Sequence, residues 1–218
     1  MKIVSLIPAR GGSKRLPRKN ILKLLGRPLI DYAIRASIDS KIDETWLSTE
    51  DEEIKNIALK CGAEVLDRPK ELAKDNTSTE AVIGHFTENI DYDILVLIEP
   101  TYPMIQKNDI DLSLDKFADS KCDSLLTLEN KKFFVWKIKD DIEASPKNYN
   151  PRKRPRYQNF NGLYVEEGGI YITTRDNFLK TKCRLNGKIG YYILNHPSID
   201  IDNEIDFKIA EMLIKWYI

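Results

Sequence analysis

The residues best suited to chemistry lie at positions 8–20, in the segment Pro-Ala-Arg-Gly-Gly-Ser-Lys-Arg-Leu-Pro-Arg-Lys-Asn. Its paired glycines, Gly11 and Gly12, allow a tight turn whose backbone N–H groups can point toward an anion. The segment also holds five cations in a chain whose formal net charge is zero: Arg10, Lys14, Arg15, Arg18 and Lys19. Because it follows an apolar run typical of a buried first strand, it favours a phosphate-binding loop over a solvated basic loop.

A pair of carboxylates forms the second group, in the run Ser198-Ile199-Asp200-Ile201-Asp202. In an extended strand Asp200 and Asp202 would share one face, roughly 6 to 7 Å apart. Two such carboxylates repel each other unless a cation lies nearby, and Mg²⁺ is the natural partner. The structural alternative is that one aspartate caps the final helix, a role that Asn203 with Asp206 could also fill.

Together the two groups indicate a site for phosphate and a divalent metal. The basic segment contains neither the Walker motif nor the G-x-G-x-x-G dinucleotide motif. The combination suits nucleotidyl transfer, in which cations hold a triphosphate and Mg²⁺ bridges its oxygens. A nucleophile then attacks the α-phosphorus in line, and catalysis comes mainly from positioning and charge neutralisation.

The elements that must position these residues alternate along the first 130 residues. Apolar runs predict strands at 3–7, 45–48, 63–66, 94–98 and 124–128, and after a break at 169–173 and 189–194. Helical patterns occupy 28–38, 51–61, 79–89, 110–117 and 204–216. This alternation predicts an α/β fold, a mostly parallel twisted sheet with helices on both faces. Ligands of such sheets bind beyond the carboxyl ends of the strands, where the basic segment lies.

The break in the pattern, residues 131–165, is punctuated by Pro146, Pro151 and Pro155 and is rich in Arg and Tyr. We interpret it as an excursion from a single domain spanning 1–218, either a lid or an arm that contacts a second subunit.

The composition fits a single globular core, with 218 residues, 42% hydrophobic and 31% charged. Equal numbers of basic and acidic residues, 34 of each, argue against nucleic-acid binding. No apolar run approaches the roughly 20 residues of a membrane span, and no signal-peptide pattern precedes the first strand. Three widely separated cysteines are typical of reduced thiols. We therefore expect a cytoplasmic protein without nucleic-acid or membrane partners.

At this point the residues resemble a known family. Segment 8–20 is similar to the signature of the CMP-sialic acid synthetases (N-acylneuraminate cytidylyltransferases). Matching runs continue in the family's order: Leu47-Ser48-Thr49-Glu50, Arg68-Pro69 with Glu71-Leu72-Ala73 and Asp75, Pro100-Thr101-x-Pro103, Lys153-Arg154-Pro155-Arg156-Tyr157-Gln158, Gly169-x-Tyr171, and 198–202 with Glu204 and Asp206.

The resemblance implies a Rossmann-like nucleotidyltransferase. Such an enzyme would transfer CMP from CTP to the anomeric hydroxyl of a nonulosonic (sialic-type) acid and release pyrophosphate. The resemblance also implies Mg²⁺ or another divalent cation as cofactor. The expected assembly is a homodimer in which the protruding arm reaches the partner's active site.

Residue roles follow from the same resemblance. It assigns the CTP phosphates to Arg10, Gly11, Gly12, Ser13, Lys14 and Asn20. Lys19 would stabilise charge on the α-phosphate and would form the catalytic set with Arg10 and Asp202. It assigns the cytosine and ribose to Arg68, Thr77, Ser78 and Thr79. Alternatively, Ser78 or Thr77 caps a helix and Arg68 supports one through a salt bridge.

The remaining assignments concern the sugar and the metal. The sugar pocket is assigned to Thr101, Arg156, Gln158 and Tyr171. Asp200 and Asp202 match the metal-binding pair, one of which could also help to deprotonate the anomeric hydroxyl. The two histidines, His85 and His196, match no catalytic position, and we expect structural roles for both.

Two pocket positions depart from the pattern, Glu99 where Gln is common and Glu167 where Asn-Gly is usual. An ionised carboxylate only accepts hydrogen bonds, so the sugar could be Kdn or a legionaminic or pseudaminic relative instead of N-acetylneuraminate. Alternatively, the glutamates point away and pair with arginines such as Arg10, Arg156 or Arg175. Rival functions are a CMP-Kdo synthetase and a non-catalytic nucleotide sensor that keeps the fold.

Overall fold

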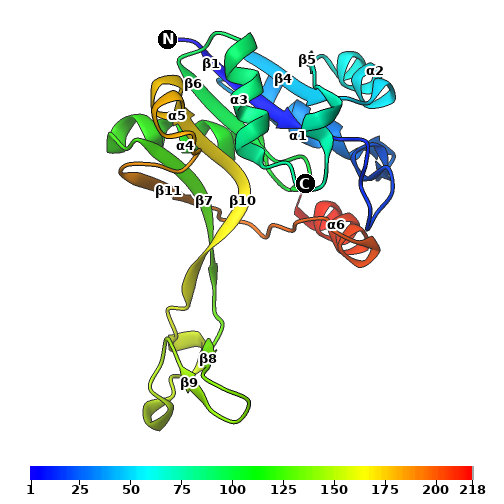
Figure 1. The fold of residues 1–218 in the computed structure, drawn as a ribbon. Helices are drawn as coiled ribbons and strands as arrows, with labels where there is room; N and C mark the ends of the chain where they lie inside the picture. The colour runs from blue at the N-terminus through cyan, green and yellow to red at the C-terminus, as the bar shows by residue number, and fades with distance from the viewer. Residues whose placement is uncertain (218) are drawn as a thin grey trace.

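A seven-stranded sheet forms the centre of the chain in a computed structural model, which describes residues 1–217 (Figure 1). Its strands are β1 (Ile3–Pro8), β4 (Glu44–Thr49), β5 (Glu64–Asp67), β6 (Ile94–Ile98), β7 (Ser124–Lys131), β10 (Leu163–Thr174) and β11 (Ile189–Ile193). The order across the sheet is β11-β7-β10-β6-β1-β4-β5. Only β10 runs antiparallel to its neighbours, because it returns directly from the arm as the hairpin partner of β7. The prediction of a mostly parallel sheet is confirmed.

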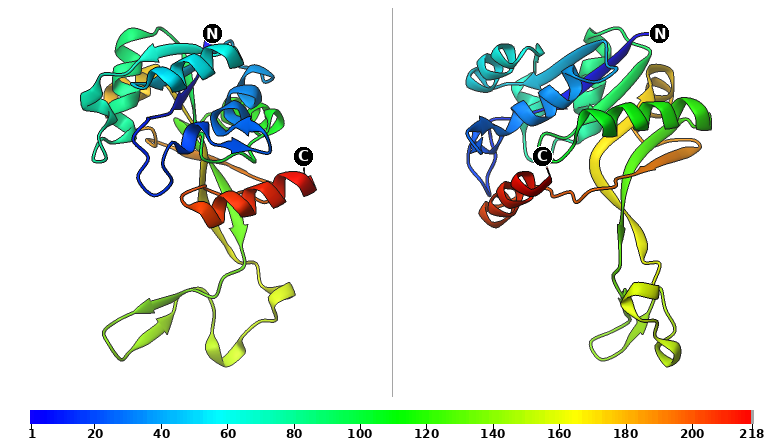
Figure 2. Two further views of the ribbon diagram at one scale, coloured as in Figure 1. Left: turned by 90° about the vertical axis from the view of Figure 1, so that its right-hand side faces the viewer. Right: turned by 180° about the vertical axis from the view of Figure 1, so that it is seen from behind.

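Helices cover both faces of this sheet, as predicted (Figure 2). Buried side chains of α1 (Leu29–Ile38), α2 (Glu52–Cys61) and α4 (Lys107–Ser120) form the core of one face. On the other face lie α3 (Thr79–Asn89) and α5 (Arg175–Thr181), whose Phe86 and Phe178 are fully buried. The sequence pattern did not predict α5, a helix of two turns. Within residues 1–217, no helix combines the length and apolar character that crossing a bilayer requires.

Local signals explain where the helices begin and end. The Asp51 carboxylate accepts the N–H groups of Glu53 and Ile54 at the start of α2, and Gly62 ends that helix with φ +96°. Helix α4 begins three residues before the predicted position because Gln106 and Asp109 form a capping box.

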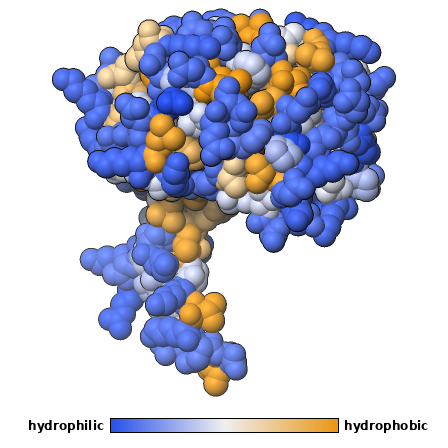
Figure 3. Space-filling model, turned by 45° about the horizontal axis from the view of Figure 1, so that its top comes forward, coloured by the Kyte–Doolittle hydropathy of each residue, from blue (hydrophilic) through white to orange (hydrophobic). Residues whose placement is uncertain are grey.

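Residues 131–165 form an arm that protrudes from the body of the chain (Figures 1 and 2). Strands β7 and β10 form its stem, and β8 (Trp136–Ile138) and β9 (Ala144–Pro146) pair near its tip. The ring of Phe134 stacks on that of Phe160 with centroids 4.6 Å apart. Hydrophobic residues are exposed on the stem and tip of the arm (Figure 3). The aromatic side chains of Trp136 and Tyr157 are exposed as well.

The C-terminal helix α6 (Glu204–Tyr217) packs apart from the sheet, against the short hairpin of β2 (Lys23–Leu24) and β3 (Arg27–Pro28). Ala210 and Ile214 of α6 share a core with Leu24 and Ile201. This packing carries the segment that precedes α6 across the carboxyl ends of the central strands.

Candidate active site

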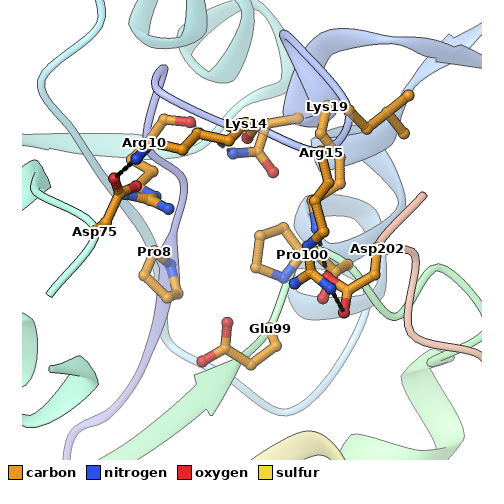
Figure 4. A pocket seen from close by; sticks show the side chains of 13 residues that line it. Pro8, Arg10, Lys14, Arg15, Lys19, Asp75, Glu99, Pro100 and Asp202 are labelled. Carbon is orange, nitrogen blue, oxygen red and sulfur yellow. Dashed lines mark hydrogen bonds and ion pairs between the residues drawn. The ribbon is translucent and has the colours of Figure 1, made fainter. Parts of the chain in front are cut away.

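A cavity of about 420 Å³ opens beyond the carboxyl ends of β1 and β6 (Figure 4). Its lining residues are Pro8, Arg10, Ser13, Lys14, Arg15, Leu16, Lys19, Asn20, Asp75, Glu99, Pro100, Thr101 and Asp202. Segments from both ends of the chain therefore meet at the edge of the sheet where ligands of such folds bind.

A smaller cavity of about 190 Å³ adjoins the first and shares Pro8, Arg10, Asp75 and Glu99 with it. It is further lined by Arg68, Leu72, Lys74, Thr77, Ser78, Thr79 and Val82. Asp75 lies on the shared wall, where its carboxylate accepts a hydrogen bond from Arg10 at 2.8 Å and forms an ion pair with Lys14. The site is thus divided into a cationic half and a half rich in hydroxyl groups.

Four of the five cations in the glycine-containing segment line the larger cavity. The fifth, Arg18, points away and pairs with Asp51 and Glu53. The N–H of Gly11 donates to Glu50 at 2.8 Å, and a Cβ at Gly11 would lie 2.4 Å from a carboxylate oxygen of Asp51. Gly11 is therefore needed for close packing against α2, and its N–H is already engaged within the protein.

Lys19 and Asp202 lie 183 residues apart in the sequence and meet in the cavity. The Lys19 ammonium donates to the carbonyl of Ile201 at 2.5 Å and lies 3.4 Å from Asp202 Oδ1. The other oxygen of Asp202 lies 3.0 Å from the Arg15 guanidinium (Figure 4). The Asp202 carboxylate is therefore held between two cations.

The run 198–202 is irregular, and the expectation of a strand there is wrong. No neighbouring strand pairs with it among the described residues, and its backbone is held by the Ile201 N–H, which donates to the Thr101 carbonyl at 2.9 Å. Ile201 is still fully buried, and of the two aspartates that flank it, Asp202 lines the larger cavity whereas Asp200 lines neither cavity.

Asp200 has an unsatisfied oxygen. Its Oδ1 is buried and has no hydrogen-bond partner in the described part of the chain. Burial raises the pKa of Asp200; the Thr101 hydroxyl opposes this shift, and the charge of Asp202 adds to it. A cation would supply the missing partner, so the pair fits Mg²⁺. No cluster of three or more His, Cys, Asp or Glu within residues 1–217 is arranged to hold a metal. Phosphate oxygens and water would have to complete the coordination.

In the smaller cavity, Ser78 caps α3 by accepting the N–H of Ala81 at 3.2 Å, and the Thr77 hydroxyl donates to the carbonyl of Glu71. The capping alternative therefore describes Ser78, which nevertheless borders the cavity. Arg68 is buried and donates to the carbonyl and hydroxyl of Ser48 at 2.6 and 3.1 Å. Burial lowers the pKa of Arg68 to about 10.

Glu99 follows β6 and borders both cavities (Figure 4). Its N–H donates to the Gly169 carbonyl at 3.0 Å. Burial raises the pKa of the Glu99 carboxyl to about 7, although Arg184 and other cations lower it in part. A protonated carboxyl can donate a hydrogen bond, so Glu99 is not restricted to the acceptor role expected from its type.

Glu167 lies outside both cavities. It is 5% exposed, and its carboxylate accepts hydrogen bonds from Thr127, Ser198 and the N–H of Gly169. Glu167 therefore points away from the sugar pocket, as the alternative interpretation expected. Its partners, however, are two hydroxyls and a backbone amide and not arginines.

The other proposed sugar ligands are divided between the body and the arm. Thr101 lines the larger cavity, whereas Arg156 and Gln158 are exposed on the arm and line neither cavity of the candidate site. The Tyr171 hydroxyl donates to Glu166, and Arg184 lies over its ring, 4.5 Å from the centroid.

Of the two histidines, His196 is structural as expected, because its Nε2 lies 2.9 Å from Asp109 Oδ2 at the start of α4. Asp75 and Arg15 belonged to recognised runs without an assigned role, and nothing in the sequence pattern indicated Arg184.

This combination of fold and charged cavity suits nucleotidyl transfer, and comparison with known proteins identifies the family of the chain. A family described as Cytidylyltransferase matches residues 4–215. N-acylneuraminate cytidylyltransferase B of Danio rerio is 35% identical over 215 residues, covering 96% of this chain and 51% of the relative. Pseudaminic acid cytidylyltransferase of Campylobacter jejuni is 32% identical, covering 99% of this chain and 97% of the relative.

The fold is also shared with a solved structure of CMP:2-keto-3-deoxy-manno-octonic acid synthetase complexed with CTP. The TM-score is 0.75 at 18% identity, and the match covers 100% of both chains.

The chain belongs to the cytidylyltransferase family. The resemblance to the CMP-sialic acid synthetases is confirmed. The chain spans about half the length of the fish relatives that it matches.

Proposed function

We propose that this chain transfers CMP from CTP to the anomeric hydroxyl of a nonulosonic acid and releases pyrophosphate. The observation that carries this proposal is the meeting of Lys19 with Asp202 in a cavity lined by four cations. A lone basic loop would also bind other polyanions. The carboxylate pair beside it points to a triphosphate that arrives with a metal.

In this proposal the cationic half binds the triphosphate through Arg10, Lys14 and Lys19. Without nucleotide, the Asp75 carboxylate forms ion pairs with Arg10 and Lys14. The phosphate oxygens of CTP would replace Asp75 as the partner of these two cations. The hydroxyl-rich half, with Arg68 and 77–79, would hold the ribose and cytosine. Lys19, whose side chain is 14% exposed, would remain to stabilise charge on the α-phosphate.

Asp200 and Asp202 would hold Mg²⁺, which supplies charge neutralisation for the phosphates when it is bound. The unpartnered Oδ1 of Asp200 supports this assignment. One of the two carboxylates would also accept the proton of the sugar hydroxyl.

We propose a homodimer in which the arm of each chain supplies Arg156 and Gln158 to the partner's sugar site. Both residues are exposed and line neither cavity of the candidate site, and the arm extends away from the body of the chain (Figure 2). Exposed aromatic side chains on the arm support this role, because aromatic residues and arginine are enriched in interface cores.

Release of pyrophosphate from CTP tests the reaction across a panel of nine-carbon and eight-carbon keto acids. The panel contains N-acetylneuraminate, Kdn, a pseudaminic acid and Kdo, and UTP replaces CTP as a control. We expect release with CTP and at least one nine-carbon acid. Release with Kdo alone would favour the CMP-Kdo synthetase alternative. Binding of CTP without release of pyrophosphate in the presence of any of the acids would favour the nucleotide sensor.

A further inference from the structure

Strand β10 departs from regular pairing at the point nearest the site. Its register with β7 shifts between Glu166 and Tyr171. Gly168 there has φ +96°, and a Cβ would lie 2.5 Å from the Tyr102 hydroxyl. This β-bulge turns the Glu167 side chain into the protein interior.

The buried Glu167 carboxylate has three donors and uses both oxygens. Oε2 accepts from the Thr127 hydroxyl at 2.7 Å and from the Gly169 N–H at 2.8 Å. Oε1 accepts from the Ser198 hydroxyl at 2.5 Å. A buried carboxylate is tolerated only when it is well supplied with donors, so this position is built for an acceptor of several bonds. The first two bonds hold Glu167 to the sheet, and the third reaches out to another segment.

Ser198 begins the irregular segment that carries the two aspartates. Its N–H donates to the Glu129 carboxylate at 3.0 Å, so its N–H and its hydroxyl are both held by glutamates of the β7–β10 hairpin. The next backbone anchor is the Ile201 N–H on the Thr101 carbonyl. Asp200 lies between these anchors, and with no strand pairing its position depends on them.

We propose that Glu167 is a positioning residue that holds Ser198 and thereby fixes Asp200 beside Asp202, next to the cavity. The inference rests on the proposed function only in that these aspartates bind the metal. Residues that orient metal ligands typically change metal affinity or activity 10- to 100-fold when mutated. Glu167, which the sequence predicted to contact the sugar, would thus act by positioning a metal ligand.

The test uses the variant Ser198→Ala of the chain 1–218. It removes the hydroxyl bond to Glu167 and keeps both the backbone bond to Glu129 and the two bonds of Glu167 to the sheet. Thr87→Val is the matched control, because it removes a buried hydroxyl of α3 that bonds Tyr92 at 2.6 Å, remote from the site. Hydrogen–deuterium exchange of the peptide containing Ile201 measures the tether directly. Electron paramagnetic resonance of Mn²⁺ with CTP present measures metal affinity without turnover.

For Ser198→Ala we expect exchange at Ile201 to rise at least about 10-fold and Mn²⁺ affinity to fall by about 10-fold or more. The control should change neither. Glu167→Gln should retain most of the affinity, since its amide can donate to the Ser198 hydroxyl while its oxygen accepts from Gly169.

Unchanged exchange in Ser198→Ala would overturn the inference, and so would faster exchange with unchanged Mn²⁺ affinity. If Ser198→Ala changes both the exchange at Ile201 and the Mn²⁺ affinity, while the native protein releases no pyrophosphate with any keto acid, the positioning role stands and the proposed function fails.

Discussion

Glu99 gives the sharpest prediction, because its carboxyl is partly buried at the junction of the two cavities. Its pKa is raised to about 7 from an ordinary value of 4.5. Below pH 4.5 the carboxyl is protonated in both the folded and the unfolded chain and costs nothing. As the pH rises from 4.5 to 7, the unfolded chain loses this proton and the folded chain keeps it, so the free energy of unfolding falls.

Glu99→Gln removes this pH-dependent loss. The interval between 4.5 and about 7, at about 1.4 kcal/mol for each pH unit, corresponds to roughly 3 kcal/mol. The variant should therefore gain stability over the native protein progressively from pH 4.5 to 7. Above pH 7 the advantage should stay near this value.

Urea unfolding of both proteins at pH 5, 6, 7 and 8.5, without ligand, measures the difference in free energy of unfolding. Glu64→Gln, an exposed glutamate of β5, is the control and should show no such trend. A difference between Glu99→Gln and native protein that does not vary with pH would refute the reasoning, whatever its absolute size.

Four further predictions concern the site and the assembly. Lys19→Ala should lower kcat by roughly 10² to 10³-fold with little change in Tm, and full activity would contradict its role. Asp202→Ala should abolish the Mg²⁺ dependence of turnover, which a metal titration measures. Asp75→Asn should lower the Kd of CTP several-fold by calorimetry, because Arg10 and Lys14 lose a competing anion; weaker binding would mean that Asp75 supports the nucleotide. Light scattering should show a dimer at micromolar concentration, and a fully active monomer would exclude the shared site.

The Glu99 carboxyl also gives a prediction on the choice of sugar substrate. Comparing kcat/KM for N-acetylneuraminate and Kdn in native protein and Glu99→Gln tests whether Glu99 selects the sugar. A tenfold native preference for N-acetylneuraminate that the substitution leaves unchanged would exclude this role.

The central strands could be predicted from sequence because their side chains are buried on both faces and form continuous apolar runs. The 94–98 run coincides with β6, and each of its residues is buried. Strand β10 could be predicted only in its core half, because the stem of the arm is exposed and carries no such run. Helix α5 is too short to show a helical period.

The site was predictable where charge and glycine spacing carry the information, as for Lys19 and Asp202. The burial of Glu167 was not predictable, because it depends on a bulge that turns one side chain inward, and residue type alone cannot show that direction. The altered pKa of Glu99 likewise depends on burial and on Arg184, a distant residue.

The antiparallel return of β10 has a consequence for how such a protein can diverge. Its pairing with β6 and β7 fixes the stem of the arm, whereas the segment beyond the stem has few contacts with the body. Doubling a flexible connection costs only about 0.6 kcal/mol in closure entropy. The tip can therefore lengthen, shorten or be exchanged without disturbing the nucleotide half. If the arm supplies the partner's sugar site as proposed, a change of acceptor sugar and a change of partner could arise together in this one hairpin.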